Sequence, residues 1–493
     1  MENRMNWKKL MCAERIRPYH NPSSTDLRTE FEKDYHRIIS SASFRRMQDK
    51  TQVFPLDQSD FVRTRLTHSL EVSSFAKSLG QNVANRMLKE HIDPDFTEQT
   101  KNDICDVLQC AGLLHDIGNP SFGHFGESAI QDWFRDNLKQ LYFQGKSLEE
   151  LFSEQMKQDF FHFEGNTQAF RIVTKLHFLV DENGMNLTKA LLGTIMKYPG
   201  SSLEIRYDRK DPDRDIRHKK MGFFYADREQ YINIQESNGT NGYRHPLSFL
   251  LEAADDIAYK TADIEDALKK GLLSYEKLKE ELTARLDSMK IRQFMGEVTQ
   301  EQVNAFEKLL GKLQDKYELA IQKNYENPAL YAVQNWLVRV QGAMLGETAD
   351  VFIAHYEELM HGKLRQDLIS FTSLSELMEA LSDIAYRYAF VSAPILKLEV
   401  AADTIYDFLL KRFTKAFLYY DTDLWKERAT AVDTKLVMLL SENYKRTYQY
   451  YSEGKDEIEK LYLRMLLVTD YLCGMTDGFA KRLYQELNGI SID

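Results

Sequence analysis

The chain has 493 residues, of which 43% are hydrophobic and 28% are charged. This composition is ordinary for a globular protein that buries a large core. The formal net charge of −11 argues against a general nucleic-acid coat protein, because such proteins are usually basic, but it leaves room for a local basic pocket that binds an anion.

Helices dominate the expected secondary structure, since glycine (23) and proline (10) are both scarce. Apolar residues recur at three- and four-residue steps over 66–92 and over 102–117, and this spacing predicts two amphipathic helices. A Gly-Asn-Pro sequence ends the second of them. A third helix opens in the segment GHFGE (123–127) and runs through Phe134.

The rest of the chain continues this helical pattern with one interruption, over about 206–234. Residues 166–180 and 187–197 look helical, whereas the very polar stretch 206–220 predicts an exposed loop. Residues 222–234 have the aromatic content of strands and predict a small β-hairpin. From Pro246 onward the pattern is helical almost throughout, with connections near 271–275, 296–299, 326–328 and 361–372.

The cysteines and the N-terminus favour a cytoplasmic protein. The four cysteines contain no CxxC pair, so we expect reduced, buried thiols at Cys12, Cys105, Cys110 and Cys473. The N-terminal segment lacks the apolar stretch of a signal peptide. No run of 18 uninterrupted apolar residues occurs, so we expect no membrane span.

A set of histidines and aspartates carries the strongest chemical signal. His115 and Asp116 lie together at the end of an apolar helix, with His68 upstream and Asp255 downstream on two further helices. Three helices can bring four such donors onto one ion and leave sites open for water and a phosphate oxygen. Mixed nitrogen and oxygen donors suit Mn, Fe or Mg better than a closed zinc site.

Long stretches around these residues resemble the dGTP triphosphohydrolase family of the HD-domain phosphohydrolase superfamily. The resemblance reaches from about residue 30 to 487 and is loose over 270–460. The segments that carry it are KTQVFP (50–55), DFVRTRLTHSLEV (60–72), LLHDIGNPSFGHFGE (113–127), EAADDIAYKTADIEDA (252–267) and DYLCGMTDGFA (470–480). They are far more specific than an isolated His-Asp pair.

The resemblance implies the metal ligands His68, His115, Asp116 and Asp255, and a divalent cofactor that is Mn or Mg, with Fe as an alternative. Asp256 is the neighbouring candidate for the fourth ligand. Asp255 is chosen because the family pattern is Asp-x3-Tyr-x3-Asp, which residues 255, 259 and 263 satisfy on one helix face.

His124 and Glu127 are the candidate acid–base pair. They stand three residues apart at the start of a helix and so share a face. A carboxylate bonded to one imidazole nitrogen fixes the tautomer and raises the basicity of the other nitrogen. Their position matches the family's catalytic dyad. The sequence leaves open whether His124 activates the attacking water or protonates the departing 5′-oxygen of the sugar.

A triphosphate needs cations beyond the metal, since it carries roughly four negative charges at neutral pH. The resemblance implies that Arg65, Lys197 and Lys220 contact the phosphates, and Lys219 is one residue from the last of these. Tyr198, which follows Lys197, is a weaker candidate for lining the same pocket.

Three further residues match positions that hold the sugar. Tyr259 resembles the tyrosine that packs against the deoxyribose, and a rigid ring there excludes a 2′-hydroxyl by steric clash. Gln52 and Asp263 match positions that bind the 3′-hydroxyl. A buried carboxylate and amide left unpaired are costly, so 3′-deoxy analogues should bind less well.

The expected fold is mainly α: an HD-domain helical fold with a small β-hairpin insertion and a helical C-terminal region. We expect an N-terminal segment (1–60) that contributes to the site, an HD core with insertions (61–270) and a C-terminal region (271–493) packed on that core. The resemblance also implies a homo-oligomer, a hexamer in many family members, and leaves a nucleotide or single-stranded DNA effector open.

The expected reaction is metal-dependent hydrolysis of a deoxynucleoside triphosphate, dGTP in the family, to deoxynucleoside and inorganic tripolyphosphate. One alternative is an HD-type nucleotidase or phosphodiesterase that acts on another phosphoester. A second is a nucleotide sensor or nucleic-acid-binding protein without activity, which is disfavoured because all four ligands and both dyad members are present.

Overall fold

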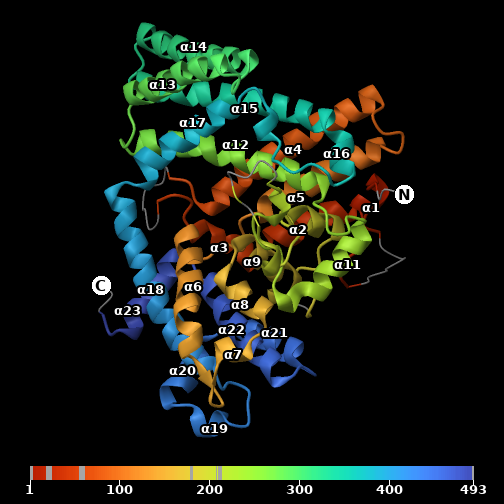
Figure 1. The fold of residues 1–493 in the computed structure, drawn as a ribbon, viewed down its shortest axis with the longest axis vertical. Coiled ribbons are helices and arrows are strands. Elements are labelled where there is room, and N and C mark those ends of the chain that lie inside the picture. The colour runs from red at the N-terminus through yellow and green to blue at the C-terminus, as the bar shows by residue number, and fades with distance from the viewer. Residues whose placement is uncertain are drawn as a thin grey trace.

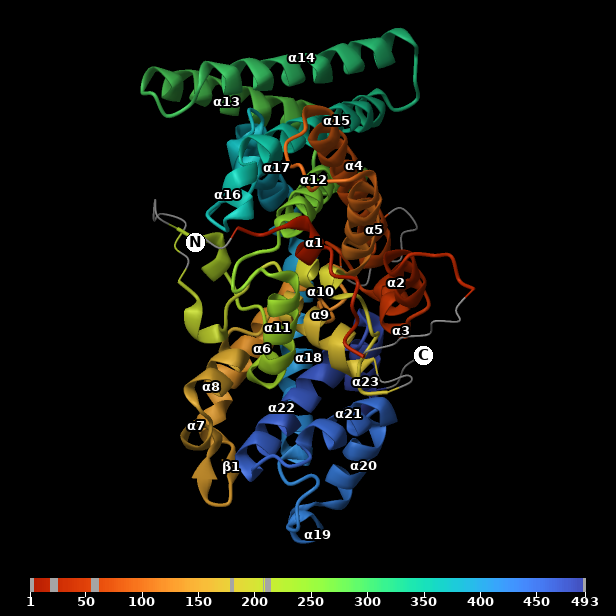
Figure 2. The same cartoon turned by 90° about the vertical axis from the view of Figure 1, so that its right-hand side faces the viewer.

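The fold was analysed in a computed structural model, which describes residues 4–490 apart from 18–24, 55–61, 178–180, 207 and 209–213. The expected mainly α fold is confirmed: long helices make up most of the described chain, and its one sheet has two strands (Figures 1 and 2). None of the described helices is long and apolar enough to span a membrane. All four cysteines are free, and only Cys12 is not fully buried.

The first half of the chain alternates long helices with short turns. Its helical segments, where η marks a short 3₁₀ or π segment, are α1 (Trp7–Leu10), α2 (Glu30–Ile39), α3 (Ala42–Arg46), η1 (Met47–Asp49), α4 (Arg65–Glu90), α5 (Glu98–Leu114), α6 (His124–Asn137), η2 (Leu138–Gln140), α7 (Leu148–Leu151), α8 (Glu154–Phe161), α9 (Gly165–Arg171), η3 (Ile172–Leu176), α10 (Lys189–Ile195), η4 (Ser202–Glu204), η5 (Ile216–His218), η6 (Tyr225–Asp227) and α11 (Arg228–Asn238).

The second half is helical from Pro246 onward, as expected. Its segments are α12 (Pro246–Lys269), α13 (Tyr275–Phe294), α14 (Gln300–Gln322), α15 (Pro328–Ala354), α16 (Tyr356–Met360), η7 (Ile369–Phe371), α17 (Ser375–Ala385), η8 (Tyr386–Phe390), α18 (Ala393–Phe417), α19 (Trp425–Arg428), α20 (Ala431–Leu439), α21 (Glu442–Ser452), α22 (Glu457–Cys473) and α23 (Asp477–Leu487). The four expected connections fall between these helices or on the short η7 segment.

The helices that carry the candidate ligands begin at identifiable caps. The Thr64 hydroxyl accepts a hydrogen bond from the Thr67 backbone N–H and so starts α4. The His245 ring caps α12, where Pro246 fills the first helical position. Between α4 and α5 the backbones approach closely, since a Cβ on Gly112 would lie 2.5 Å from the Ser73 Cα.

The buried apolar side chains form two clusters. The first is built on α4, α5, α12, α15 and α17, in the upper part of Figure 1. The second is built on α6, α8, α18, α20, α22 and α23, in the lower part. Each cluster combines residues from before and after residue 270. The division at 60 and 270 stays a prediction.

The small hairpin exists, but the location expected for it is wrong. Residues 225–238 form η6 and α11 instead of strands, because Tyr231, Ile234 and Asn238 are buried at three- and four-residue steps. The hairpin pairs β1 (Tyr142–Phe143) with antiparallel β2 (Lys146–Ser147). Positive φ values at Gln144 and Gly145, 50° and 87°, form the tight turn that twisted strands prefer.

The expected exposed loop over 206–220 falls partly outside the described residues. Its described end is not wholly exposed, because η5 buries Ile216 to 3% exposure. The backbone N–H of Ile216 also donates to the Arg365 carbonyl. This segment therefore anchors to the region after α16, a long-range contact that its polar composition did not indicate.

Candidate active site

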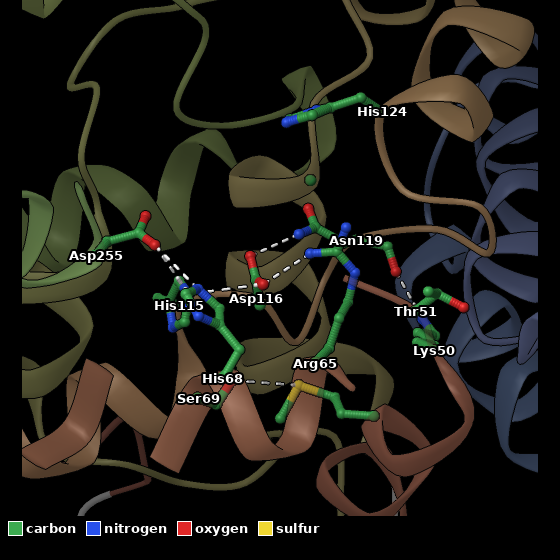
Figure 3. Close-up of polar contacts among 12 residues, drawn as sticks. Lys50, Thr51, Arg65, His68, Ser69, His115, Asp116, Asn119, His124 and Asp255 are labelled. Carbon is green, nitrogen blue, oxygen red and sulfur yellow. Dashed lines mark hydrogen bonds and ion pairs between the residues drawn. The ribbon is translucent and has the colours of Figure 1, made fainter. Parts of the chain in front are cut away.

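The structure brings His68, His115, Asp116 and Asp255 together from three helices (Figure 3). Ligand atoms of His68, His115 and Asp116 all lie within 4.8 Å of one another. Asp255 Oδ1 lies 3.2 Å from His68 Nε2 and 3.4 Å from His115 Nε2. The neighbouring Asp256 instead pairs with Lys260 at 2.9 Å, so the geometry favours Asp255 as the fourth donor.

Hydrogen bonding orients His115 to bind a cation. His115 Nδ1–H donates to the Gly112 carbonyl at 2.7 Å, which leaves the Nε2 lone pair directed at the carboxylates. That Nε2 is buried and has no hydrogen-bond partner within the described part of the chain, and neither has His68 Nδ1. Two imidazoles and two carboxylates are a donor set that fits an Mn- or Mg-like ion. The residues present therefore fit a divalent metal.

The electrostatics of the cluster also favour positive charge. Burial lowers the pKa of His115, but Asp116 and Asp255 together outweigh it and raise that pKa. Burial favours a neutral Asp255, yet Lys197 and then His115 hold its pKa well below the usual range. The carboxylates thus stay ionised and make a field that a divalent cation satisfies.

Both oxygens of Asp116 are oriented by neighbours. Arg65 Nη1 donates to Oδ2 at 2.6 Å, and Asn119 Nδ2 donates to Oδ1 at 2.6 Å. The backbone carbonyl of Asn119 accepts from Lys50 Nζ at 2.6 Å, and this amine also donates to the backbone carbonyl of Cys473 at 2.7 Å. Such outer contacts fix the angle at which a ligand meets its metal.

His124 and Glu127 form the expected pair at the start of α6. His124 Nδ1–H donates to Glu127 Oε2 at 2.9 Å, and Glu127 Oε1 accepts from the Gly165 backbone N–H at 2.8 Å. The Glu127 side chain is 6% exposed, whereas that of His124 is 79% exposed. The hydrogen bond to Glu127 raises the pKa of His124. The buried Glu127 therefore orients the imidazole, whose ring remains open to a ligand.

Arg65 connects the four candidate metal ligands to this pair. These ligands, His68, His115, Asp116 and Asp255, are called the donor cluster below. His124 lies apart from the donor cluster in Figure 3, on the far side of Asp116 and Asn119. A Cβ on Gly123, the residue before His124, would lie 2.6 Å from Arg65 Nη2. Gly123 and Phe122 both adopt positive φ, 61° and 62°, so a tight turn places α6 against the guanidinium.

The two candidate phosphate-binding lysines are both paired with carboxylates. Lys197 Nζ lies 2.8 Å from Asp255 Oδ2, and Lys220 Nζ lies 2.6 Å from Glu164 Oε2. Burial lowers the pKa of each lysine, but the neighbouring carboxylates outweigh it and raise both pKa values. Both side chains therefore carry a positive charge at neutral pH.

The candidate sugar residues lie on α12 and on the segment before α4. Tyr259 and Asp263 follow Asp255 at helical spacing, and Asp263 is only 3% exposed. Burial, and then Asp266, raise the pKa of Asp263 well above its ordinary value. Among the described residues, none forms a hydrogen bond with the buried Gln52 Oε1, so this oxygen is available to a ligand hydroxyl.

Tyr198 is less well placed than its neighbour Lys197. It is 5% exposed, and its ring centroid lies 6.0 Å from the Arg244 guanidinium carbon. Burial raises the pKa of its hydroxyl well above the ordinary value. Its contacts fit a residue that supports the wall of the site, and a direct role at the phosphates stays a prediction.

Four residues that support the site were missed from the sequence: Lys50, Asn119, Glu164 and Gly165. Asn119 and Lys50 lie inside segments that carry the resemblance, so their position was available as a signal, although their contacts were not. Gly165 has no such signal. A Cβ there would overlap Asn119 Oδ1 and lie 2.7 Å from Glu127 Oε1, so only glycine lets the two side chains approach.

Comparison with known proteins defines the class of this helical fold and its His/Asp cluster. The sequence profile described as the HD domain matches residues 65–217, a range that contains His68, His115, Asp116 and both members of the acid–base pair. The chain thus contains an HD domain, which is a fold of metal-dependent hydrolases.

Three relatives then define the family. A deoxyguanosinetriphosphate triphosphohydrolase-like protein of Listeria monocytogenes is 44% identical over 490 residues, covering 99% of this chain and 100% of the relative. A protein of the same description from Synechocystis is 32% identical over 99% of this chain and 100% of the relative. The deoxyguanosinetriphosphate triphosphohydrolase of Yersinia enterocolitica is 30% identical over 96% of this chain and 97% of the relative. The chain belongs to the deoxyguanosinetriphosphate triphosphohydrolase family, as the sequence motifs indicated.

Proposed function

We propose that the protein hydrolyses deoxynucleoside triphosphates, dGTP foremost, to a deoxynucleoside and inorganic tripolyphosphate. One observation carries the proposal: Arg65 contacts Asp116 of the donor cluster with one nitrogen and lies against the turn before His124 with the other. Arg65 therefore borders both the metal ligands and the turn before His124, so a phosphate bound at the metal ligands would lie near the oriented imidazole. The relatives that bear the triphosphohydrolase name support the substrate class.

His68, His115, Asp116 and Asp255 would hold a divalent ion, Mn or Mg, with Fe as the alternative. When bound, the ion supplies a Lewis acid for the α-phosphate. Water forms a new bond to the α-phosphorus, the bond from that phosphorus to the sugar 5′-oxygen breaks, and the 5′-oxygen gains a proton. His124 either takes a proton from the water or gives one to the 5′-oxygen, and Glu127 stabilises the imidazolium in both cases.

The cations bind the rest of the triphosphate. Arg65, Lys197 and Lys220 are each paired with a carboxylate. A bound phosphate offers them further acceptor oxygens, and charge-assisted hydrogen bonds of this kind are the strong ones. Tyr198 supports this wall. These side chains hold the phosphates in place while the reacting bond is attacked.

The deoxyribose is recognised on α12 and at Gln52. The Tyr259 ring leaves no room for a 2′-hydroxyl and so excludes ribonucleotides. Asp263, whose pKa is raised by burial and by Asp266, stays protonated over a wider pH range and can donate as well as accept. Together with Gln52 it binds the 3′-hydroxyl. A homo-oligomer, a cytoplasmic location and a nucleotide or DNA effector stay predictions.

Product analysis tests the proposal. The protein is incubated with each dNTP and each NTP in Mn²⁺ or Mg²⁺, and the products are separated by anion-exchange chromatography and assigned by phosphorus NMR. We expect tripolyphosphate and a deoxynucleoside from dNTPs only. Release of orthophosphate or pyrophosphate, or hydrolysis of nucleoside monophosphates or phosphodiesters alone, would instead identify the other HD-type activity.

A further inference from the structure

The segment over 470–480 carries the family resemblance, yet the proposed chemistry uses none of its residues. Asp477, the first residue of α23, is 2% exposed. Its carboxylate accepts three hydrogen bonds, all from residues more than 350 positions away in the chain. A buried carboxylate with such partners connects distant loops, so its partners indicate what it does.

One carboxylate oxygen of Asp477 holds the segment that contains Gln52. Oδ2 accepts from the Thr51 backbone N–H at 3.0 Å and from the Thr51 hydroxyl at 2.5 Å. Thr51 forms a β-bridge with Thr64, the N-cap of α4, and the Arg65 N–H donates to the Lys50 carbonyl. This oxygen therefore fixes the residue before Gln52 and the start of the helix that carries His68.

The other oxygen holds the turn that leads into α6. Oδ1 accepts from the Phe122 backbone N–H at 2.8 Å. Phe122 is one of the two consecutive residues with positive φ, a conformation that a phenylalanine adopts only when its surroundings enforce it. Two residues later His124 begins α6. The direction of the imidazole therefore depends on this hydrogen bond.

A second contact joins the same three segments. Lys50 is a buried residue, 4% exposed. Its amine donates to two backbone carbonyls, those of Asn119 and of Cys473 at the end of α22. Figure 3 shows Lys50 and Thr51 beside Asn119, on the side that faces away from His115 and Asp255. The residues that flank the turn between α22 and α23, Cys473 and Asp477, thus contact both loops that border the candidate site.

We propose that Asp477 is a positioning residue: its carboxylate sets the Gln52 segment and the Phe122–Gly123 turn at the same time. Recognition of the sugar and proton transfer by His124 then depend jointly on the start of the last helix. The inference rests on the proposed function, because it names what the two loops do. It assigns Asp477 no contact with substrate or metal.

The direct test is Asp477→Asn in the full-length protein. A carboxamide has one acceptor oxygen, so its NH₂ group faces an N–H donor at one of the two loops. Because a misplacement of about 1 Å can cost about 100-fold in rate, we expect kcat for dGTP to fall by about that factor. We also expect weaker discrimination between dGTP and its 3′-deoxy analogue, with unchanged metal content. A merely structural role would not alter that discrimination.

Thr476→Ala is the matched control. The Thr476 hydroxyl caps α23 by accepting from the Phe479 N–H at 3.3 Å. Its loss should lower the melting temperature of the protein without changing the discrimination between the two nucleotides. If Thr476→Ala and Asp477→Asn lose the same activity, helix stability alone explains the effect and the inference is wrong.

Thr51→Val keeps the test valid if Asp477→Asn does not fold. Valine removes one donor to Asp477 and preserves the shape, so we expect a loss of about tenfold in kcat/KM. In a folded double variant, the second substitution should cost less than it does alone, because the two residues share one contact. Additive losses would overturn the inference. Absence of tripolyphosphate release by the unmodified protein would instead refute the proposed function.

Discussion

The metal donors and the acid–base pair stand on different hydrophobic clusters. His68, His115 and Asp255 come from α4, the end of α5 and α12, which build the first cluster. His124 lies on α6, whose inner face belongs to the second cluster. The positions of these three metal ligands are thus set within the first cluster. The distance from them to the His124 imidazole depends instead on contacts between the two clusters. Substitutions on the two sides should therefore fail in different ways.

Loss of a metal donor should have the largest effect. The Asp255 carboxylate lies close to both histidine rings, and Asp255→Asn replaces it by a neutral amide. We therefore expect loss of the divalent ion and a fall in turnover on the order of 1000-fold. Bound metal is measured by elemental analysis, and turnover by tripolyphosphate release.

Asp256→Asn is the control for this substitution. Asp256 directly follows Asp255 on α12 but pairs with Lys260. We expect metal content close to that of the unmodified protein. If Asp256→Asn loses the ion and Asp255→Asn retains it, the choice between these two aspartates must be reversed.

Loss of the His124 imidazole should reduce turnover while leaving the metal site on the first hydrophobic cluster intact. His124→Ala removes a side chain that is 79% exposed and hydrogen-bonds to Glu127. We expect unchanged metal content and a fall in kcat of about 100- to 1000-fold. Unchanged turnover would refute the assignment of the acid–base pair.

The pH profile of Glu127→Gln tells which role His124 plays. The hydrogen bond to Glu127 raises the pKa of His124, so its loss should lower that pKa. If His124 acts as a base, the acidic limb of kcat/KM moves to lower pH. If it acts as an acid, the basic limb moves to lower pH. A profile with neither limb displaced would show that His124 does not transfer a proton in the rate-limiting steps.

The sequence predicted the first side of the comparison better than the second. Apolar periodicity located α4 and α5 to within a few residues, and the resemblance added the four donors that the structure brings together. The contacts between clusters have no periodic signal. Asp477 and Phe122 lie 355 positions apart, and only folding brings them within hydrogen-bonding distance. Residues 222–234 were misassigned because aromatic content suggested strands, whereas helical spacing governs burial over most of this segment.

Asn119→Ala should have a smaller effect, on the metal side. The amide orients Asp116 without being a donor to the ion itself. Outer contacts of this kind typically contribute 10- to 100-fold, so we expect about that loss of metal affinity. The affinity is measured by Mn²⁺ titration followed by electron paramagnetic resonance. The affinity of Glu127→Gln for Mn²⁺ should stay unchanged, and an equal loss there would mean that the two sides are not separable.

The smallest effect concerns the start of α12. His245 is buried, accepts from the Leu247 N–H and donates to the Leu10 carbonyl, and burial lowers its pKa to about 4. Since the unfolded chain binds a proton near pH 6.5, it holds more protons than the folded chain between these values, and the free energy of unfolding falls as the pH drops. At pH 5.5 the loss is about 1.4 kcal/mol. His245→Asn keeps a capping oxygen, so chemical denaturation should show this dependence removed, whereas the exposed His91→Asn should leave it unchanged. The same slope in both variants would place the titrating group elsewhere.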